Sequence, residues 1–326
     1  MRKKVIIETE HSNRKDAGQE SFTEGLKVEN LSKKYRNFQL GQVNFAIPPG
    51  NILGLLGQNG SGKTTTIKIL AGHTKKNQGR IWINGVSLEK HPIQAKAQIG
   101  FMLEGPMFFE NKSLWENGKA FGRFYPNFTE KNWRKWLSVC KLQPSSWLGL
   151  LSQGERMKFQ FAFAMAHCPK VLLLDEPTGN LDPVFRREFL DILQEVVEEE
   201  QISVVFSTHL TSDLERIADQ IVLLDQGRML YADTIEHMQE RYCLVKGGPK
   251  EGRDLKERGE PGIVGIQISQ VGYEAMVDLN QSSDDFRNKI QQTDYEYETI
   301  DLSKWMYYMT KGGNNCGSYV ETNQAV

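Results

Sequence analysis

The first two stretches of the chain differ sharply in their pattern of apolar and polar positions. Residues 1–25 are mostly polar and charged, and such a segment has too little apolar surface to offset the entropy of ordering it. From Leu26 onward, short β-type runs at 43–47, 52–56 and 81–83 are separated by glycine, asparagine and proline, which is the pattern of strands joined by turns. We predict a polar N-terminal extension over 1–25 and a β-rich lobe after it.

A regular alternation of helical and strand patterns follows Ser152. The predicted order is helix, strand, helix, strand, helix and strand, over about 154–168, 171–174, from 183, 202–206, 213–218 and 221–224. The helix after Asp182 is well marked, because aspartate caps free amides and Pro183 suits the first helical position. Strands that alternate with helices pair in parallel through crossover helices, so we predict a layered α/β core.

Large aromatic side chains are dense between about residues 105 and 150, at spacings that suit helices. They are Phe108, Phe109, Trp115, Phe121, Phe124, Tyr125, Phe128, Trp133, Trp136 and Trp147. Two interpretations are open: an ordinary helical core, or an exposed aromatic groove that receives a partner helix.

The last stretch, 246–326, has a weaker pattern. Residues 246–265 are rich in glycine, proline and charge, which is typical of a linker, and residues 263–279 contain candidate strands. Apolar residues at i, i+3, i+4 and i+7 then mark an amphipathic helix, namely Leu302, Trp305, Met306 and Met309. We predict a linker and a small C-terminal α+β domain.

Composition and charge exclude several classes of protein. The 326 residues are 39% hydrophobic and 25% charged, with 40 Lys plus Arg against 41 Asp plus Glu, so no global field would draw the chain to nucleic acid or acidic lipid. The basic start is followed by only three apolar residues, and later apolar runs are far shorter than a membrane span. The four widely spaced cysteines indicate reduced thiols. We expect a chain that is not exported and crosses no membrane by itself.

The strongest chemical signal is the string GQNGSGKT at 57–64, between the apolar run 52–56 and a helix-like segment. Strand, glycine loop and helix form the context that this phosphate-binding motif requires. Its backbone amides and the following helix dipole attract phosphate, Lys63 would reach the β- and γ-phosphates, and Thr64 would ligate Mg²⁺. The candidate phosphate-binding residues are Gly57, Asn59, Gly60, Ser61, Gly62, Lys63, Thr64 and Thr65.

Two acids end the predicted strand at 171–174. Asp175 and Glu176 follow four apolar residues, and acids at the carboxyl end of a buried strand usually face a ligand, because burial without a partner is costly. We expect Asp175 to hold Mg²⁺, directly or through water. Glu176 would be the general base that orients the attacking water.

A third string, LSQGE at 151–155, has two interpretations. Ser152 and Glu155 form S-x-x-E, a capping box that begins a helix. A helix N-terminus opened by Ser152 and Gly154 is also an anion site, so the same residues can do both.

These three strings together resemble the ATPase subunits of ATP-binding cassette (ABC) transporters, over about residues 26–240. The resemblance implies a P-loop NTPase fold of ABC type, with a β-rich nucleotide-binding lobe and a helical subdomain at about 105–165. LSQGE is close to the LSGGQ signature of the family. Tyr35 stands where an aromatic residue stacks on adenine, and residues 180–182 match the loop that joins two subunits. His209 matches the switch histidine that contacts the γ-phosphate.

One position departs from the family pattern. Glu104 stands where the family usually has the glutamine of the loop between core and helical subdomain. An ionised glutamate can still bind Mg²⁺ but cannot donate a hydrogen bond. This variant resembles the ATPases of bacitracin-type and lantibiotic-type exporters, and the resemblance favours export.

The resemblance also implies partners and a mechanism. In the family each ATP lies between the phosphate loop of one subunit and the signature of another, so two cassettes are required. A separate transmembrane permease would carry the substrate, with this chain in the cytoplasm on the inner face of the membrane. Two other classes compete: a soluble cassette protein that acts on ribosomes or DNA, and a module that senses ATP without hydrolysis. The sequence has neither a second cassette nor long coiled coils, and Glu176 and His209 are both present.

Overall fold

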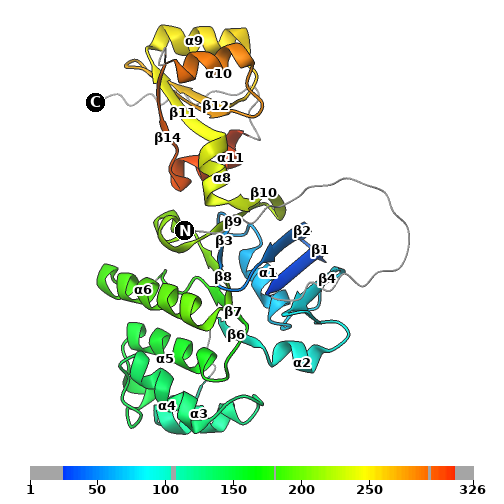
Figure 1. Ribbon diagram of the computed structural model, residues 1–326, viewed down its shortest axis with the longest axis vertical. Helices are drawn as coiled ribbons and strands as arrows, with labels where there is room; N and C mark the ends of the chain where they lie inside the picture. Colours follow the sequence, from blue (N-terminus) through cyan, green and yellow to red (C-terminus); the bar gives the residue numbers. More distant parts are fainter. Residues whose placement is uncertain (1–24, 104–107, 180, 293–294, 313–326) are drawn as a thin grey trace.

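The computed structural model describes residues 25–103, 108–179, 181–292 and 295–312. The predicted N-terminal extension therefore lies outside the described residues except for Gly25, with which they begin. Outside them also lie Glu104, Asn180 and Cys316. A six-stranded sheet in the order β10-β9-β3-β8-β7-β6 forms the centre of the molecule (Figure 1). These strands are β10 (Arg228–Thr234), β9 (Gln220–Asp225), β3 (Ile52–Leu56), β8 (Ser203–Thr208), β7 (Val171–Asp175) and β6 (Ile99–Met102).

Neighbouring strands of this sheet run parallel except for the β9–β10 hairpin. The predicted layered α/β core is confirmed, and the alternating side chains of each strand supply both of its layers. Leu172, Leu174 and Phe206 enter one apolar cluster, whereas Leu173 and Val205 enter another on the opposite face. Because both faces are covered, the central strands β3 and β7 are buried at every position.

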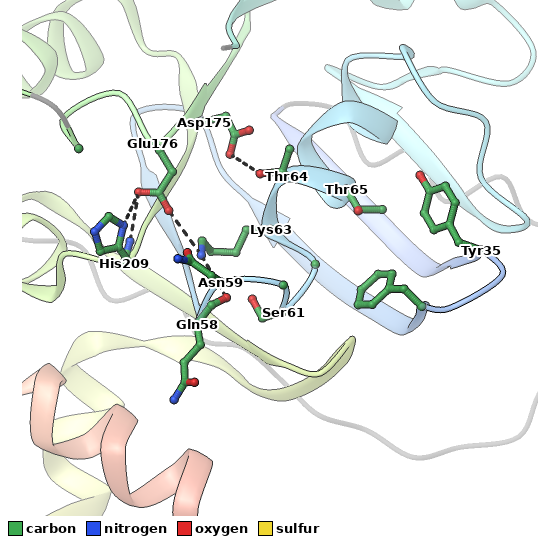
Figure 2. Close-up of a pocket in the computed structure, with 14 residues that line it drawn as sticks. Tyr35, Gln58, Asn59, Ser61, Lys63, Thr64, Thr65, Asp175, Glu176 and His209 are labelled. Atoms are coloured by element: carbon green, nitrogen blue, oxygen red, sulfur yellow. Dashed lines mark hydrogen bonds and ion pairs between the residues drawn. The ribbon is translucent and has the colours of Figure 1, made fainter. Parts of the chain in front are cut away.

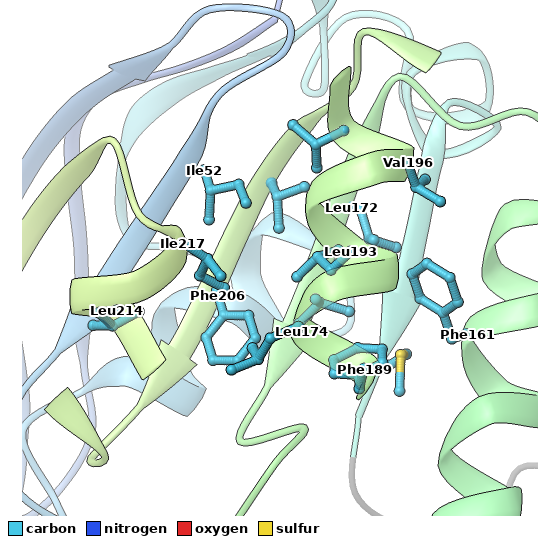
Figure 3. Close-up of a cluster of buried hydrophobic side chains, with 14 of the residues drawn as sticks. Ile52, Phe161, Leu172, Leu174, Phe189, Leu193, Val196, Phe206, Leu214 and Ile217 are labelled. Carbon is cyan, nitrogen blue, oxygen red and sulfur yellow. The ribbon is translucent and has the colours of Figure 1, made fainter. Parts of the chain in front are cut away.

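Helices cover the first of these faces (Figure 3). The cluster joins the sheet to α5 (Gln153–Met165), α6 (Pro183–Glu200) and α7 (Thr211–Ile217) through buried side chains such as Phe161, Phe189 and Leu214. Asp182 caps α6 as expected: its carboxylate accepts hydrogen bonds from the amides of Val184 and Phe185.

The opposite face packs against α1 (Lys63–Leu70) and an antiparallel sheet in the order β2-β1-β4-β5. This sheet contains two of the three runs predicted for the β-rich lobe, 43–47 and 81–83, whereas the third run, 52–56, is β3 of the central sheet. The elements of the antiparallel sheet are β1 (Leu26–Lys34), β2 (Gln39–Ile47), β4 (Gln78–Ile83) and β5 (Val86–Ser87), and the short helix α2 (Pro92–Lys96) follows.

A helical lobe lies at one end of the long axis of the molecule (Figure 1). It contains α3 (Leu114–Gly122), α4 (Glu130–Val139), the 3₁₀ turn η1 (Leu148–Leu150) and α5. Some of its aromatic side chains belong to the hydrophobic core, because Trp133 and Trp136 are buried. Phe109, Phe124 and Trp147 are more than half exposed, so each of the two interpretations of this stretch accounts for some of its aromatic residues.

A separate unit occupies the other end of the long axis (Figure 1). Its strands and helices follow the order β-α-β-β-α-β, and its antiparallel sheet has the order β12-β13-β11-β14, which is the split βαβ, ferredoxin-like arrangement. The elements are β11 (Tyr242–Gly247), α9 (Pro249–Arg258), β12 (Ile263–Ile268), β13 (Tyr273–Asp278), α10 (Asp284–Gln291) and β14 (Glu296–Thr299). The unit is joined to β10 by α8 (Ile235–Arg241).

The predicted linker at 246–265 is wrong, because these residues contain α9 and parts of two strands. Pro249 takes an early position of α9, the Glu251 carboxylate accepts a hydrogen bond from the Gly248 amide, and Gly259 ends the helix in the left-handed region. Leu255 supplies the buried side. The glycine and proline that suggest a linker are thus the start and stop signals of a helix.

The predicted amphipathic helix is confirmed as α11 (Leu302–Gly312), and it attaches this unit to the core. The Leu302 amide donates to Glu215 Oε1 of α7 at 2.6 Å. Trp305 is fully buried against Tyr231 and Tyr242, with ring centroids 4.9 and 6.1 Å away. No described helix is both long and apolar enough to cross a bilayer.

We expect Trp305→Ala to lower the free energy of unfolding by about 3–5 kcal/mol, because it leaves a cavity between α11 and β10. Chemical denaturation of the full chain, followed by circular dichroism, measures this loss. Tyr307→Ala on the same helix is the matched control, since Tyr307 is 36% exposed. Equal losses in the two variants would contradict the packing role of Trp305.

Candidate functional site

The loop between β3 and α1 lies at the carboxyl end of the central sheet, and the Ser61 amide donates to the Gln58 carbonyl within it at 3.1 Å. Gly57 has φ +151°, and a Cβ there would lie 2.2 Å from the Leu224 carbonyl oxygen. Gly62 has φ +116° and precedes the first residue of α1. Both positions exclude L side chains, so the glycines at these positions have a direct steric cause.

Lys63 lies almost wholly buried beneath this loop. Its Nζ donates to the Gly57 carbonyl at 2.8 Å and lies 3.4 Å from Glu176 Oε1. The Gly57 carbonyl and the Glu176 carboxylate therefore hold the ammonium group at the wall of the cavity. A phosphate that enters the cavity can replace these partners with charge-assisted hydrogen bonds of its own to the ammonium group.

Asp175 lies beside Thr64 at the end of β7. The Thr64 hydroxyl donates to Asp175 Oδ1 at 3.2 Å, and the Ser207 hydroxyl donates to the same oxygen at 2.6 Å. Within the described residues no group of three or more His, Cys, Asp or Glu side chains gathers as a metal cage. One carboxylate and one hydroxyl nevertheless fit Mg²⁺, which commonly completes its shell with phosphate oxygens and water.

Glu176 directly follows this strand, with its backbone in the left-handed region at φ +48°. The Ser207 carbonyl and hydroxyl both accept from its amide, at 3.0 and 3.1 Å. Glu176 Oε2 lies 2.8 Å from His209 Nδ1. Since an ionised carboxylate only accepts, Nδ1 carries the hydrogen of this bond. Two residues from adjacent strands thus form one acid–imidazole pair.

These residues line a single cavity of about 770 Å³ (Figure 2). The cavity wall consists of Tyr35, Phe38, Gln58, Asn59, Gly60, Ser61, Gly62, Lys63, Thr64, Thr65, Asp175, Glu176, Gly179 and His209. Figure 2 shows Tyr35 at the end opposite Glu176 and His209. The cavity is therefore elongated, with an aromatic end and a charged end.

Sequence reasoning missed three of these lining residues. Phe38 packs against the loop, because a Cβ on Gly62 would lie 3.2 Å from its ring. The signal for it was a second aromatic residue three positions after Tyr35. Gln58 lies within the 57–64 string and Gly179 three residues after Glu176, and no sequence signal marked either as a lining residue.

A buried polar atom also marks the phosphate end. Ser61 is 2% exposed, yet its Oγ has no hydrogen-bond partner among the described residues. Buried hydroxyls are nearly always satisfied. An acceptor such as a phosphate oxygen would satisfy this one, so the loop fits a phosphate ligand.

The signature residues lie outside this cavity. Ser152 and Glu155 form the expected capping box at the start of α5, and hydrogen bonds from the Ser152 hydroxyl and amide hold the pKa of Glu155 below its usual value. Neither Ser152 nor Gly154 lines the cavity of its own chain. Glu104, the remaining predicted metal ligand, lies outside the described residues.

Comparison with known proteins identifies the family. A family model described as ABC transporter matches residues 40–179. The uncharacterized ABC transporter ATP-binding protein YdbJ of Bacillus subtilis is 29% identical, covering 79% of this chain and 86% of its own. The bacitracin transport ATP-binding protein BcrA of Bacillus licheniformis is 30% identical, covering 66% and 72%. The sulfate/thiosulfate import ATP-binding protein CysA of Mesostigma viride is 36% identical, covering 62% and 60%.

A solved structure agrees with these relatives. The structure of an ATP binding subunit of an ABC transporter superposes with a TM-score of 0.60 at 28% identity, covering 66% of this chain and 92% of that one. The fold, the loop geometry and the relatives lead to one conclusion. The chain belongs to the ABC transporter family as an ATP-binding subunit, and it is an ATPase.

Proposed function

We propose that this chain powers export through a separate membrane subunit, as one of two cassettes that close around ATP. The observation that carries the proposal is the convergence of Lys63, Thr64, Asp175, Glu176 and His209 on one cavity. The signature residues Ser152 and Gly154 lie elsewhere, so half of an ATP site is missing from each chain.

The cavity suggests a role for each residue along the nucleotide. Tyr35 stacks on the adenine ring, and Phe38 lines the same end of the cavity with its ring centroid 6.4 Å from that of Tyr35. The amides of 57–62 and the hydroxyl of Ser61 hold the phosphates, with Lys63 at the β- and γ-phosphates. Thr64 and Asp175 would hold Mg²⁺, with Glu104 as a further candidate ligand. Bound there, Mg²⁺ would neutralise charge on the phosphate oxygens.

Hydrolysis needs an acceptor beside the attacking water. Glu176 faces the cavity at its charged end, and we assign it this role, with His209 holding its carboxylate and contacting the γ-phosphate. Ser152 and the Gly154 amide of the second cassette complete the site from the other side. Closure therefore depends on a triphosphate that both chains bind, and phosphate release lets them separate.

Exposed apolar side chains on the helical lobe support a membrane partner. The Glu110 carbonyl accepts from the Gly149 amide and the Lys112 carbonyl from the Leu148 amide, so the 109–112 loop lies against η1. Exposed Phe109 and Leu150 lie in these two segments, and exposed Trp147 directly precedes η1. Such a patch is typical of a surface that a partner covers, and we propose that a cytoplasmic helix of the permease docks there.

We expect Leu150→Asp to abolish co-purification with a multi-spanning membrane protein in mild detergent, because a charge is placed in the patch at a residue that is 85% exposed. The matched control is Val271→Asp, since Val271 is 93% exposed on the C-terminal unit and we expect this variant to keep the partner. Recovery of the wild-type chain with ribosomes instead of a membrane protein would contradict the proposal.

Export rather than import is proposed on two grounds: Glu104 resembles the exporter variant, and BcrA is named for bacitracin transport. The relative named for sulfate import represents the opposite direction. Inverted membrane vesicles separate the two, because an exporter fills them with substrate when ATP is added outside. Uptake into right-side-out cells alone would contradict export.

A further inference from the structure

A buried carboxylate outside the cavity wall binds a residue next to that wall: Asp213 accepts from Thr178, the neighbour of cavity-lining Gly179. Asp213 of α7 is 2% exposed. Its Oδ2 accepts from the Thr178 hydroxyl at 2.6 Å, and its Oδ1 accepts from Arg186 Nε at 2.5 Å. Arg186 also donates to the Ser212 hydroxyl at 2.8 Å. A charge buried this deeply is costly unless it is paired, and here both of its oxygens have partners.

The partners of Asp213 lie in the segment that follows Glu176 and in α6. Thr178 is two residues after Glu176, in a turn closed by the Gly179 amide, which donates to the Glu176 carbonyl at 3.3 Å. Asp213 itself is four residues after His209, in the first turn of α7. Arg186 is in the first turns of α6, the helix that follows Asp182. The Asp213 carboxylate therefore joins three segments. They are the turn at 176–179, which we call the base turn, the start of α7 after His209, and the start of α6.

The base turn needs such support. Glu176 has φ +48°, and a left-handed conformation at a residue other than glycine persists only when surrounding contacts hold it. Thr178 is 1% exposed, and its hydroxyl gives this turn a side-chain anchor on α7. Without that anchor the Glu176 carboxylate can shift relative to His209.

We infer that Asp213 is a positioning residue for hydrolysis: through Thr178 it holds Glu176 against His209, and through Arg186 it makes that geometry depend on α6. The inference rests on the proposed roles of Glu176 and His209. Displacements near 1 Å at a reacting group cost roughly a hundredfold in rate, so this contact controls kcat rather than ATP affinity. Among the described residues, the hydrogen bonds to the Asp213 carboxylate come from Thr178 and Arg186 and not from the loop that holds the phosphates.

The test is Thr178→Val, which keeps the shape of the side chain and removes the hydroxyl. We expect kcat for ATP hydrolysis by the full chain to fall about 10- to 100-fold, with the KM for ATP changed less than about twofold. Thr178→Ser restores the hydroxyl and is expected to restore most of kcat. Asp213→Asn should reproduce the loss, and the double variant should fall no further than the lower single variant, since both act through one contact.

The matched control is Thr310→Val. Thr310 is also buried, and its hydroxyl donates to the Met306 carbonyl within α11. This helix contributes no residue to the cavity wall. It reports what the loss of a buried threonine hydroxyl does to stability alone, measured by thermal unfolding alongside kcat. An unchanged kcat in Thr178→Val, or equal loss in Thr178→Val and Thr178→Ser, would overturn the inference.

Glu176→Gln in the same series separates this inference from the proposed function. Turnover lost in Glu176→Gln but kept in Thr178→Val overturns only the positioning role of Asp213. Turnover kept in Glu176→Gln removes the base assignment on which the positioning role depends.

Discussion

Glu176→Gln is expected to lower kcat for ATP hydrolysis by about 10²- to 10⁴-fold, the usual contribution of a general base. Glutamine has the same shape and still accepts a hydrogen bond through its carbonyl, but it cannot take a proton from the attacking water. The substitution also removes the negative charge 3.4 Å from Lys63 Nζ. ATP binding should therefore be retained. Phosphate release under multiple turnover measures kcat, and calorimetry measures the affinity.

The same variant should reveal the second cassette. If hydrolysis reopens the pair, a chain that binds ATP without cleaving it accumulates as a closed dimer, visible by size-exclusion chromatography with Mg²⁺ and ATP. Glu298→Gln is the control, because Glu298 pairs with Lys246 on the C-terminal unit and lies outside the cavity wall. Wild-type turnover in Glu176→Gln would remove Glu176 from the role of base, and a monomer that holds ATP would contradict closure.

Lys63→Ala is expected to have the second large effect. Loss of a charged donor to the β- and γ-phosphates should weaken ATP binding by about 1.5–3 kcal/mol, or about 10- to 100-fold, and hydrolysis should fall with it. Alanine is a good helix former at the first position of α1, so the fold should be kept. Calorimetric titration with ATP, in Mg²⁺ and again in excess chelator, measures the affinity and its dependence on the metal.

Lys68→Ala is the matched control for this substitution. Lys68 lies on the same helix and is exposed, so its loss removes one positive charge without touching the loop. We expect its ATP affinity to stay within about twofold of wild type, because an exposed charge more than a turn away is screened by solvent. Equal affinities in Lys63→Ala and wild type would refute the phosphate-binding role of the loop.

The attachment of the C-terminal unit has a structural consequence for these experiments. α11 contacts α7 through Leu302 and Glu215. Asp213 is one of the buried residues of α7. Variants of the cavity are therefore best compared in the full chain, since removal of the unit would expose one side of α7 and its apolar residues. Leu214 and Ile217 share an apolar cluster with Trp305.

The local features of the site could be predicted because each depends on residues close together in the chain. The glycine loop needs a strand before it and a helix after it, and β3 and α1 occupy those places. The capping box of Ser152 and the Asp182 cap likewise follow from residues within one turn of helix. Short-range sterics and hydrogen bonds determine such features, whatever the rest of the fold does.

The C-terminal unit shows where this local reasoning fails. Glycine, proline and charge at 246–265 suggest a linker, yet α9 there is stabilised mainly by packing: Leu255 is buried, and a Cβ on Gly252 would lie 2.6 Å from the Tyr273 side chain. Helices of this length owe their stability to tertiary contacts rather than to propensity. Tyr273 follows in another strand, so composition in a short window could not reveal the contact.

By itself, therefore, the sequence determined the phosphate loop, the order of strands and helices between Ser152 and β9, and the two acids at the end of β7. Only the tertiary structure decided which residues meet: that His209 lies 2.8 Å from Glu176, that Phe38 joins Tyr35 in the cavity wall, and that Ser152 does not. The physical reason is range. Parallel strands that are distant in the chain place their carboxyl ends side by side only after crossover helices have packed against the sheet.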